Sequence, residues 1–85
     1  MIEPLHILVV DDEEKIRLFL SEALERVGHI ITTAPSGEAA LNTLQNTNFD
    51  LAILDLKLGG RVDGQRVLEA IRWRWPTTLV IILTA

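Results

Sequence analysis

The segment ILVVDDEE, residues 7–14, places four acidic residues directly behind four aliphatic ones. Adjacent carboxylates repel one another, and burial at the end of an apolar strand makes each of them harder to ionise. Such a cluster therefore needs a nearby cation, or most of its members must point into water. Two later apolar runs also break off at a polar residue, one at Asp55 and the other at Thr84.

The carboxyl ends of parallel strands gather at one edge of a sheet, so these polar residues are expected to meet if their strands are neighbours. Asp11, Asp12 and Asp55 would then bring three carboxylates into one cleft, with the hydroxyl of Thr84 beside them. Oxygen ligands of this kind suit Mg²⁺, which prefers a few carboxylates together with a phosphate. The two glutamates that follow would begin a helix and favour its dipole.

Each of these residues also has a plainer interpretation when it is taken alone. Asp12 stands where an N-cap is expected, and Asp55 is equally consistent with a turn residue. Thr84 alone carries no information. Asp50 opens its apolar run at the opposite edge of the sheet, so we interpret it as a cap or turn residue without a site role. The joint position at three strand ends is what favours a site.

Strand-like and helix-like periodicities alternate along the chain. The expected strands are residues 5–10, 29–34, 49–56 and 79–83; the expected helices are residues 14–27, a short helix capped by Ser36, and residues 64–75, ended by Pro76. The helix over 14–27 shows an apolar stripe that includes Phe19, Leu20 and Val27. This alternation predicts an α/β fold: an open parallel sheet with helices on both faces.

Composition limits the alternatives. Eighty-five residues make one small domain, and 48% apolar with 24% charged residues is typical of a soluble globular one. The absence of cysteine excludes disulfides and thiolate zinc sites. A net charge of −4 argues against a nucleic-acid surface. No apolar run is long enough to span a bilayer and no signal-peptide pattern opens the chain, so we expect a cytoplasmic protein with no membrane contact.

Four segments together give the chain a family resemblance: LVVDDE, DLAILDL, the DG that opens the third helix, and VIILTA. In this combination they closely resemble the receiver domain of two-component response regulators, which has a flavodoxin-like fold. The resemblance implies that residues 1–85 are one receiver domain, covering the N-terminal two-thirds of the family pattern. It further implies a phosphoacceptor that assists its own phosphoryl transfer and is not otherwise an enzyme.

The resemblance also assigns roles to residues. Asp55 takes the place of the aspartate that accepts a phosphoryl group from the phosphohistidine of a sensor histidine kinase or a phosphotransfer protein. Asp11 and Asp12 match the acidic pair that holds Mg²⁺, together with Asp55 and the backbone carbonyl two residues past the acceptor, here Lys57. Thr84 matches the hydroxyl residue that senses the phosphoryl group.

Two departures from the family pattern matter. In DLKLGGRVDG, glycines replace the usual proline, and Asp63-Gly64 comes one residue late, so a longer loop is expected. The family's last helix, strand and helix, with its lysine and aromatic switch residue, have no counterpart here. Their absence would leave the fourth strand and one face of the first helix without cover, open to a homodimer through that strand. Contact with DNA would require an output domain absent here.

Two rival interpretations follow from the same residues. A phosphorylation-inert, receiver-like interaction module would keep the scaffold and self-associate through its exposed fourth strand. An aspartate-nucleophile phosphatase of another α/β family would carry an Asp-x-Asp arrangement on its first strand, whereas this chain has Asp11-Asp12-Glu13.

Overall fold

A computed structural model describes residues 3–83 as one parallel sheet with helices on both of its faces. In chain order the elements are β1 His6–Val10, α1 Glu14–Arg26, β2 Ile30–Ala34, α2 Gly37–Asn46, β3 Leu51–Asp55, α3 Gly64–Arg74 and β4 Leu79–Leu83. The strand order is β2-β1-β3-β4, and every neighbouring pair is parallel. The predicted α/β class and open parallel sheet are therefore confirmed.

Most element boundaries lie within two residues of those predicted. The third strand begins at Leu51 and not at residue 49, and Asp50, directly before it, accepts the backbone N–H of His6 on its Oδ2 at 2.8 Å. Asp50 is thus a turn residue at the amino edge of the sheet, as predicted. The helix predicted over 14–27 ends at Arg26, and Gly28 with φ +105° reverses the chain after it.

Two of the helices begin with a side-chain cap. Ser36 Oγ accepts the backbone N–H of Ala39 at 3.1 Å, which confirms it as the cap of α2. Asp63 Oδ1 accepts the N–H of Arg66 at 3.0 Å and caps α3. Each cap satisfies one of the N–H groups that the first turn of a helix leaves without a partner.

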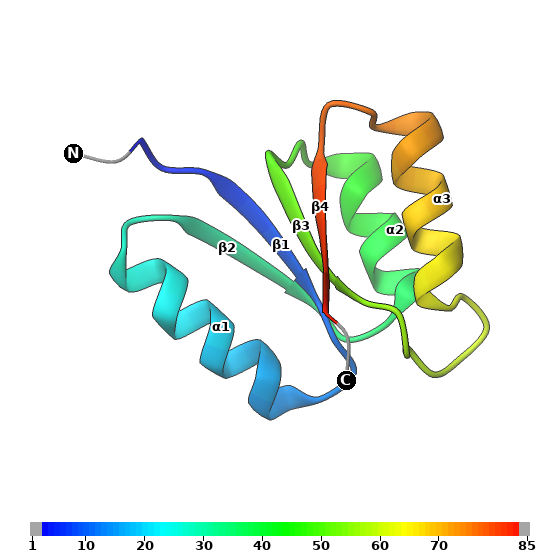
Figure 1. Cartoon of the computed structure of the whole chain (residues 1–85), viewed down its shortest axis with the longest axis horizontal. Helices are drawn as coiled ribbons and strands as arrows, with labels where there is room; N and C mark the ends of the chain where they lie inside the picture. The colour runs from blue at the N-terminus through cyan, green and yellow to red at the C-terminus, as the bar shows by residue number, and fades with distance from the viewer. Residues whose placement is uncertain (1–2, 84–85) are drawn as a thin grey trace.

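The helices divide unequally between the two faces of the sheet. Helices α2 and α3 lie side by side on one face, and α1 lies alone on the other (Figure 1). The larger apolar core fills the space under α2 and α3 and includes Leu8, Leu54, Val67 and Ile71, all buried. Among residues 3–83, the core under α1 has three buried members, which are Ile7, Val9 and Ile53.

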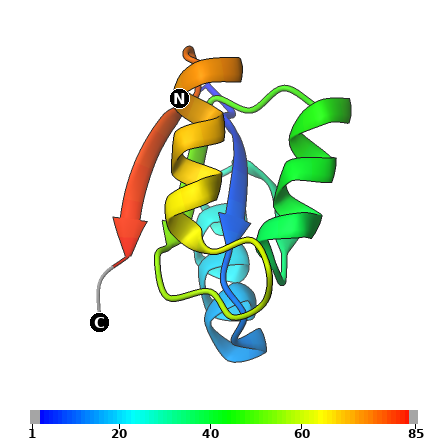
Figure 2. The same cartoon turned by 90° about the vertical axis from the view of Figure 1, so that its right-hand side faces the viewer.

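The α1 face is therefore sparsely covered. No residue of α1 is buried, and the side chain of Phe19 is 69% exposed, so the stripe predicted on this helix is only partly a core face. Strand β4 is an edge strand of the described sheet (Figure 2), with Leu79 71% and Ile81 50% exposed. The expected exposure of the fourth strand and of one face of the first helix is confirmed. Within residues 3–83, no helix combines the length and apolar character that crossing a membrane requires.

Helix α3 packs very closely on the carboxyl end of β3, and glycine makes this possible. A Cβ added to Gly64 would overlap the Cα of Leu56 and the carbonyl oxygen of Asp55. Both contacts are to backbone atoms, which cannot move aside as the tip of a flexible side chain can. The first turn of α3 therefore rests directly on the residue pair where β3 ends.

Replacing Gly64 with alanine is therefore expected to destabilise the fold. Gly64→Ala should lower the free energy of unfolding by about 1–3 kcal/mol, the usual cost of overpacking. Urea unfolding followed by circular dichroism measures the loss. Gly59→Ala is the matched control, because a Cβ there has 4.0 Å to its nearest neighbour, Asp12 Oδ2. Equal stability of the two variants would contradict the close-packing argument.

Candidate functional site

The register of the sheet brings two strand ends together. Val10 of β1 pairs with Leu54 of β3, so the next residues along, Asp11 and Asp55, come to the same edge side by side. The chain adds β2 on one side of β1 and then β3 on the other, so the gap between β1 and β3 is the switch point of the sheet. Ligands of open α/β sheets bind outside the carboxyl ends of the strands at such a point.

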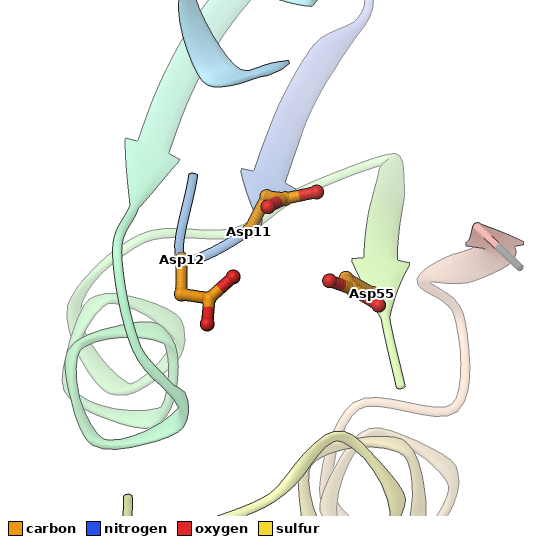
Figure 3. Close-up of side chains that lie close together, drawn as sticks. All are labelled: Asp11, Asp12 and Asp55. Atoms are coloured by element: carbon orange, nitrogen blue, oxygen red, sulfur yellow. The ribbon is translucent and has the colours of Figure 1, made fainter. Parts of the chain in front are cut away.

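Three aspartates converge there. Asp11, Asp12 and Asp55 each offer one carboxylate oxygen, and these three atoms all lie within 4.8 Å of one another. Figure 3 shows the carboxylates of Asp12 and Asp55 pointing into the space between the two strand ends, with that of Asp11 beside them. Asp11 is 5% exposed, Asp55 is half-buried and Asp12 is exposed. The structure thus brings together the three carboxylates that the sequence predicted to meet.

Backbone N–H groups hold two of these carboxylates in place. Asp11 Oδ1 accepts the N–H of Glu13 at 2.9 Å, and Asp55 Oδ1 accepts the N–H of Lys57 at 2.9 Å. Both are turns in which an aspartate binds the backbone two residues further on. Since an ionised carboxylate has two acceptor oxygens, each of these side chains keeps capacity for a cation.

The alternative role of Asp12 as the N-cap of α1 is wrong. The cap position belongs to Glu13, whose side chain makes no capping hydrogen bond. The turn made by Asp11 takes up the N–H of Glu13 and moves the start of the helix one residue further along the chain. Asp12 is thereby left exposed, with its carboxylate free to join the other two.

The predicted roles of Lys57 and Thr84 are not tested by the structure. Lys57 follows Asp55 by two residues, and its backbone reaches the site through its N–H; a ligand role for its carbonyl stays a prediction. A Cβ added to Gly59 would lie 4.0 Å from Asp12 Oδ2, so the loop after β3 passes beside the cluster. Thr84 lies outside the described residues, and its predicted role also stays a prediction.

One positioning residue escaped the sequence analysis. A Cβ added to Gly37, the first residue of α2, would overlap the backbone carbonyl of Val62, so this glycine lets the loop after β3 lie against α2. In the same loop Gly60 has φ +93°, a backbone conformation that favours glycine. Nothing local in the sequence marks Gly37, because the backbone that it lies against belongs to a distant loop.

The electrostatics of the cluster favour a cation. Burial raises the pKa of Asp11 above its ordinary value of 3.8, and the charges of Asp55 and Asp12 raise it further. The N–H of Glu13 and the charge of Arg17 lower this pKa, without reversing the shift. Ionising Asp11 therefore costs free energy in the protein alone. Three carboxylates lie close together with little positive charge near them. Such a set of oxygen donors fits a hard divalent cation such as Mg²⁺.

Fold and site together define a class: an α/β domain with a cluster of three aspartates at the switch point of a parallel sheet. The family model described as the response regulator receiver domain matches residues 7–85. The chain belongs to this family, the receiver domains of two-component response regulators, in which phosphorylation and magnesium are typical. This membership favours the receiver interpretation over the aspartate phosphatase.

Curated relatives agree with this membership. The transcriptional regulatory protein AfsQ1 of Streptomyces coelicolor is 40% identical over 79 residues, which are 93% of this chain and 34% of AfsQ1. The transcriptional regulatory protein ResD of Bacillus subtilis is 43% identical over 79 residues, which are 93% of this chain and 32% of ResD. The chain thus spans about a third of the length of these relatives.

Solved structures show the same fold. The response regulator TrrA of Thermotoga maritima, crystallised in complex with Mg²⁺-BeF, superposes with a TM-score of 0.88 at 44% identity. The match covers 94% of this chain and 69% of TrrA. The chemotaxis response regulator CheY4 of Vibrio cholerae gives a TM-score of 0.88 at 28% identity, covering 94% of this chain and 68% of CheY4.

The burial of Asp11, together with the charges of its two neighbouring carboxylates, predicts a dependence of stability on pH. Because the folded pKa of Asp11 is raised, the folded state loses stability as the pH rises from 3.8 through that pKa. Asp11→Asn removes this cost and keeps an oxygen acceptor for the N–H of Glu13. In buffer without divalent cations, the variant should unfold at a higher temperature than the wild type at pH 7, and the difference should shrink towards pH 4.

Differential scanning calorimetry over this pH range is the measurement. Adding Mg²⁺ should raise the midpoint of the wild type more than that of Asp11→Asn, because the variant has lost one carboxylate of the cluster. A variant less stable than the wild type at pH 7 without cations would show that the Asp11 charge is already compensated within the protein.

Proposed function

We propose that this chain is the phosphoacceptor of a two-component system and takes a phosphoryl group onto Asp55 with the help of Mg²⁺. The observation that carries the proposal is the convergence of Asp11, Asp12 and Asp55 within 4.8 Å at the switch point of a receiver sheet. Such a cluster combines a carboxylate nucleophile with carboxylates that can hold a metal. The chain acts as an acceptor that assists its own modification and not as an enzyme on another substrate.

In the proposed reaction, a carboxylate oxygen of Asp55 attacks the phosphorus of a phosphohistidine. A new O–P bond forms and the P–N bond breaks; its electron pair stays on the imidazole nitrogen, which takes up a proton. The N–H of Lys57 holds Oδ1 of Asp55, which leaves Oδ2 as the attacking oxygen. There is little covalent chemistry for the protein to do, so positioning and charge neutralisation supply most of the catalysis.

Mg²⁺ would be held by Asp11, Asp12 and Asp55, together with the backbone carbonyl of Lys57. When bound, it would neutralise the charge that builds up when an anionic nucleophile meets an anionic phosphoryl group. Two observations support this assignment: the raised pKa of Asp11, and the presence of Mg²⁺-BeF with the related TrrA domain. Thr84 would supply the hydroxyl that binds the phosphoryl oxygens.

The proposed phosphodonor is a sensor histidine kinase or a phosphotransfer protein, the kind of partner with which receiver domains generally interact. AfsQ1 and ResD carry the name transcriptional regulatory protein and are about three times as long as this chain. Any contact with DNA is accordingly assigned to an output domain of a longer protein. A cytoplasmic location, where such a kinase would present its phosphohistidine, completes the proposal.

A second candidate function rests on a different observation. On the α1 side of the sheet the side chains of Phe19, Leu79 and Ile81 are 69%, 71% and 50% exposed, and Leu79 and Ile81 belong to the edge strand β4. An apolar edge strand with free N–H and C=O groups is a template for pairing with another chain. The alternative is therefore an interaction module that self-associates through β4 and needs no phosphorylation.

Intact mass spectrometry after incubation with Mg²⁺ and acetyl phosphate tests the phosphoacceptor function. The wild type should gain one phosphoryl group, and Asp55→Asn should gain none. Asp50→Asn is the matched control, since Asp50 precedes the same strand at its opposite end and an asparagine oxygen can still accept the N–H of His6. A folded wild type without an adduct, or an adduct that persists in Asp55→Asn, would overturn the assignment of Asp55.

Self-association through β4 is tested by analytical ultracentrifugation across a range of protein concentrations. Ile81→Lys places a charge on the exposed edge and should abolish any dimer seen with the wild type. Ile30→Lys is the control, because Ile30 is 57% exposed on the opposite edge strand, β2. Dimerisation that does not change on addition of Mg²⁺ and acetyl phosphate would favour the interaction module. A wild type that stays monomeric at all concentrations would reject self-association through β4.

A further inference from the structure

Arg17 connects helix α1 to the end of strand β1. Its Nη1 donates a hydrogen bond of 2.8 Å to the backbone carbonyl oxygen of Asp11, and the residue is half-buried. The backbone of Arg17 is itself anchored in the helix: its N–H donates to the carbonyl of Glu13 at 3.2 Å, and its own carbonyl accepts the hydroxyl of Ser21 at 2.7 Å. The guanidinium therefore reaches back from a fixed helical turn to the strand end.

With this contact, Asp11 is held by three hydrogen bonds from different parts of the fold. The N–H of Asp11 donates to the carbonyl of Ala34 in β2 at 3.2 Å, and its carboxylate accepts the N–H of Glu13 at 2.9 Å. With Arg17 on its carbonyl, each polar group of Asp11 has a partner, one from the sheet, one from the turn and one from the helix. Of these three partners, only Arg17 is a charged side chain.

We propose that Arg17 is a positioning residue of the acidic site, holding the turn that carries Asp11 and Asp12 in the arrangement that binds a divalent cation. The proposal rests on the proposed function, because it assigns a role in cation binding at that same site. Arg17 would touch neither the cation nor the phosphoryl group; it would act through the backbone of Asp11. Groups that orient metal ligands without binding the metal commonly control its affinity.

The positive charge of Arg17 and its proposed positioning role would change the affinity of the site for a cation in opposite directions. Burial is the largest influence on the Asp11 carboxyl and raises its pKa, whereas the nearby positive charge of Arg17 lowers it. If Arg17 acted through charge alone, its removal would make the site more negative and would strengthen cation binding. If Arg17 positions the turn, its removal weakens binding, so the direction of the change separates the two roles.

The test is isothermal titration of Mg²⁺ into the wild type, Arg17→Met, Arg17→Lys and Arg26→Met. Methionine keeps an apolar stem but loses the donors and the charge, whereas lysine keeps the charge and N–H donors but lacks the planar guanidinium. Arg26→Met removes the same charge from the far end of α1 and is the matched control. We expect Arg17→Met to bind Mg²⁺ about 10- to 100-fold more weakly, Arg17→Lys to fall between it and the wild type, and Arg26→Met to match the wild type.

Folded Arg17→Met with unchanged or tighter Mg²⁺ binding would overturn the proposal, and so would an equal loss in Arg26→Met. Circular dichroism without cations checks the fold of each variant. If Arg17→Met does not fold, Arg17→Lys carries the comparison, and wild-type affinity in it would reject the proposal. Failure of the wild type to bind Mg²⁺ would instead reject the metal site itself, so the two failures are distinguishable.

Discussion

The burial of Asp11 beside two other carboxylates at one sheet edge is the constraint on which the rest of this structure depends. Parallel pairing of β1 with β3 forces Asp11 and Asp55 together, and burial leaves Asp11 only 5% exposed. In water the charge of Asp11 would be fully solvated, but burial at the strand end removes much of that solvation. The protein offsets part of this cost with backbone N–H donors and one arginine, and the pKa of Asp11 is nevertheless raised, chiefly by burial.

The same constraint shapes the backbone around the cluster. The carboxylate of Asp11 accepts the N–H of Glu13, and Glu13 is the residue at the N-cap position of α1. Asp12 therefore does not cap the helix, and its carboxylate lies near those of Asp11 and Asp55. On the other strand, Asp55 takes up the N–H of Lys57, and Gly64 brings α3 onto the end of β3. Hydrogen bonds therefore hold both aspartates, and close packing of α3 supports the end of β3, which favours a preorganised site over one that assembles on binding.

The two faces of the sheet differ in how well they are covered, and this difference bears on function. The face under α2 and α3 has a continuous buried core, whereas the face under α1 relies on Ile7, Val9 and Ile53 and leaves Phe19 largely exposed. The site lies at the edge shared by both faces. At the end of β3 the site is supported by the well-packed core under α3. At the end of β1 the chain continues into α1, which packs on the smaller core. Local opening is expected to favour the less densely packed side.

Much of this architecture was predictable from local patterns. The alternation of strand and helix periodicities gave the α/β class, and turn residues such as Ser36 and Gly28 marked helix ends close to where they occur. The abrupt acidic ends of two apolar runs, at Asp11-Asp12 and at Asp55, predicted the cluster of carboxylates, because strands of one direction must gather their ends at one edge. Close backbone packing at Gly37 was not predicted, since nothing local distinguishes a glycine that lies against a distant loop from one in an ordinary turn.

By itself, then, the sequence determined which elements form and which side chains stand at their carboxyl ends, because periodicity and capping act over a few residues. Only the tertiary structure decided which strands are neighbours, how close Asp12 comes to Asp55, and which half of the apolar stripe on α1 is covered. It also decided that Arg17 binds the carbonyl of Asp11 and not solvent. These outcomes depend on contacts between segments far apart in the chain, whose register and packing no local pattern encodes.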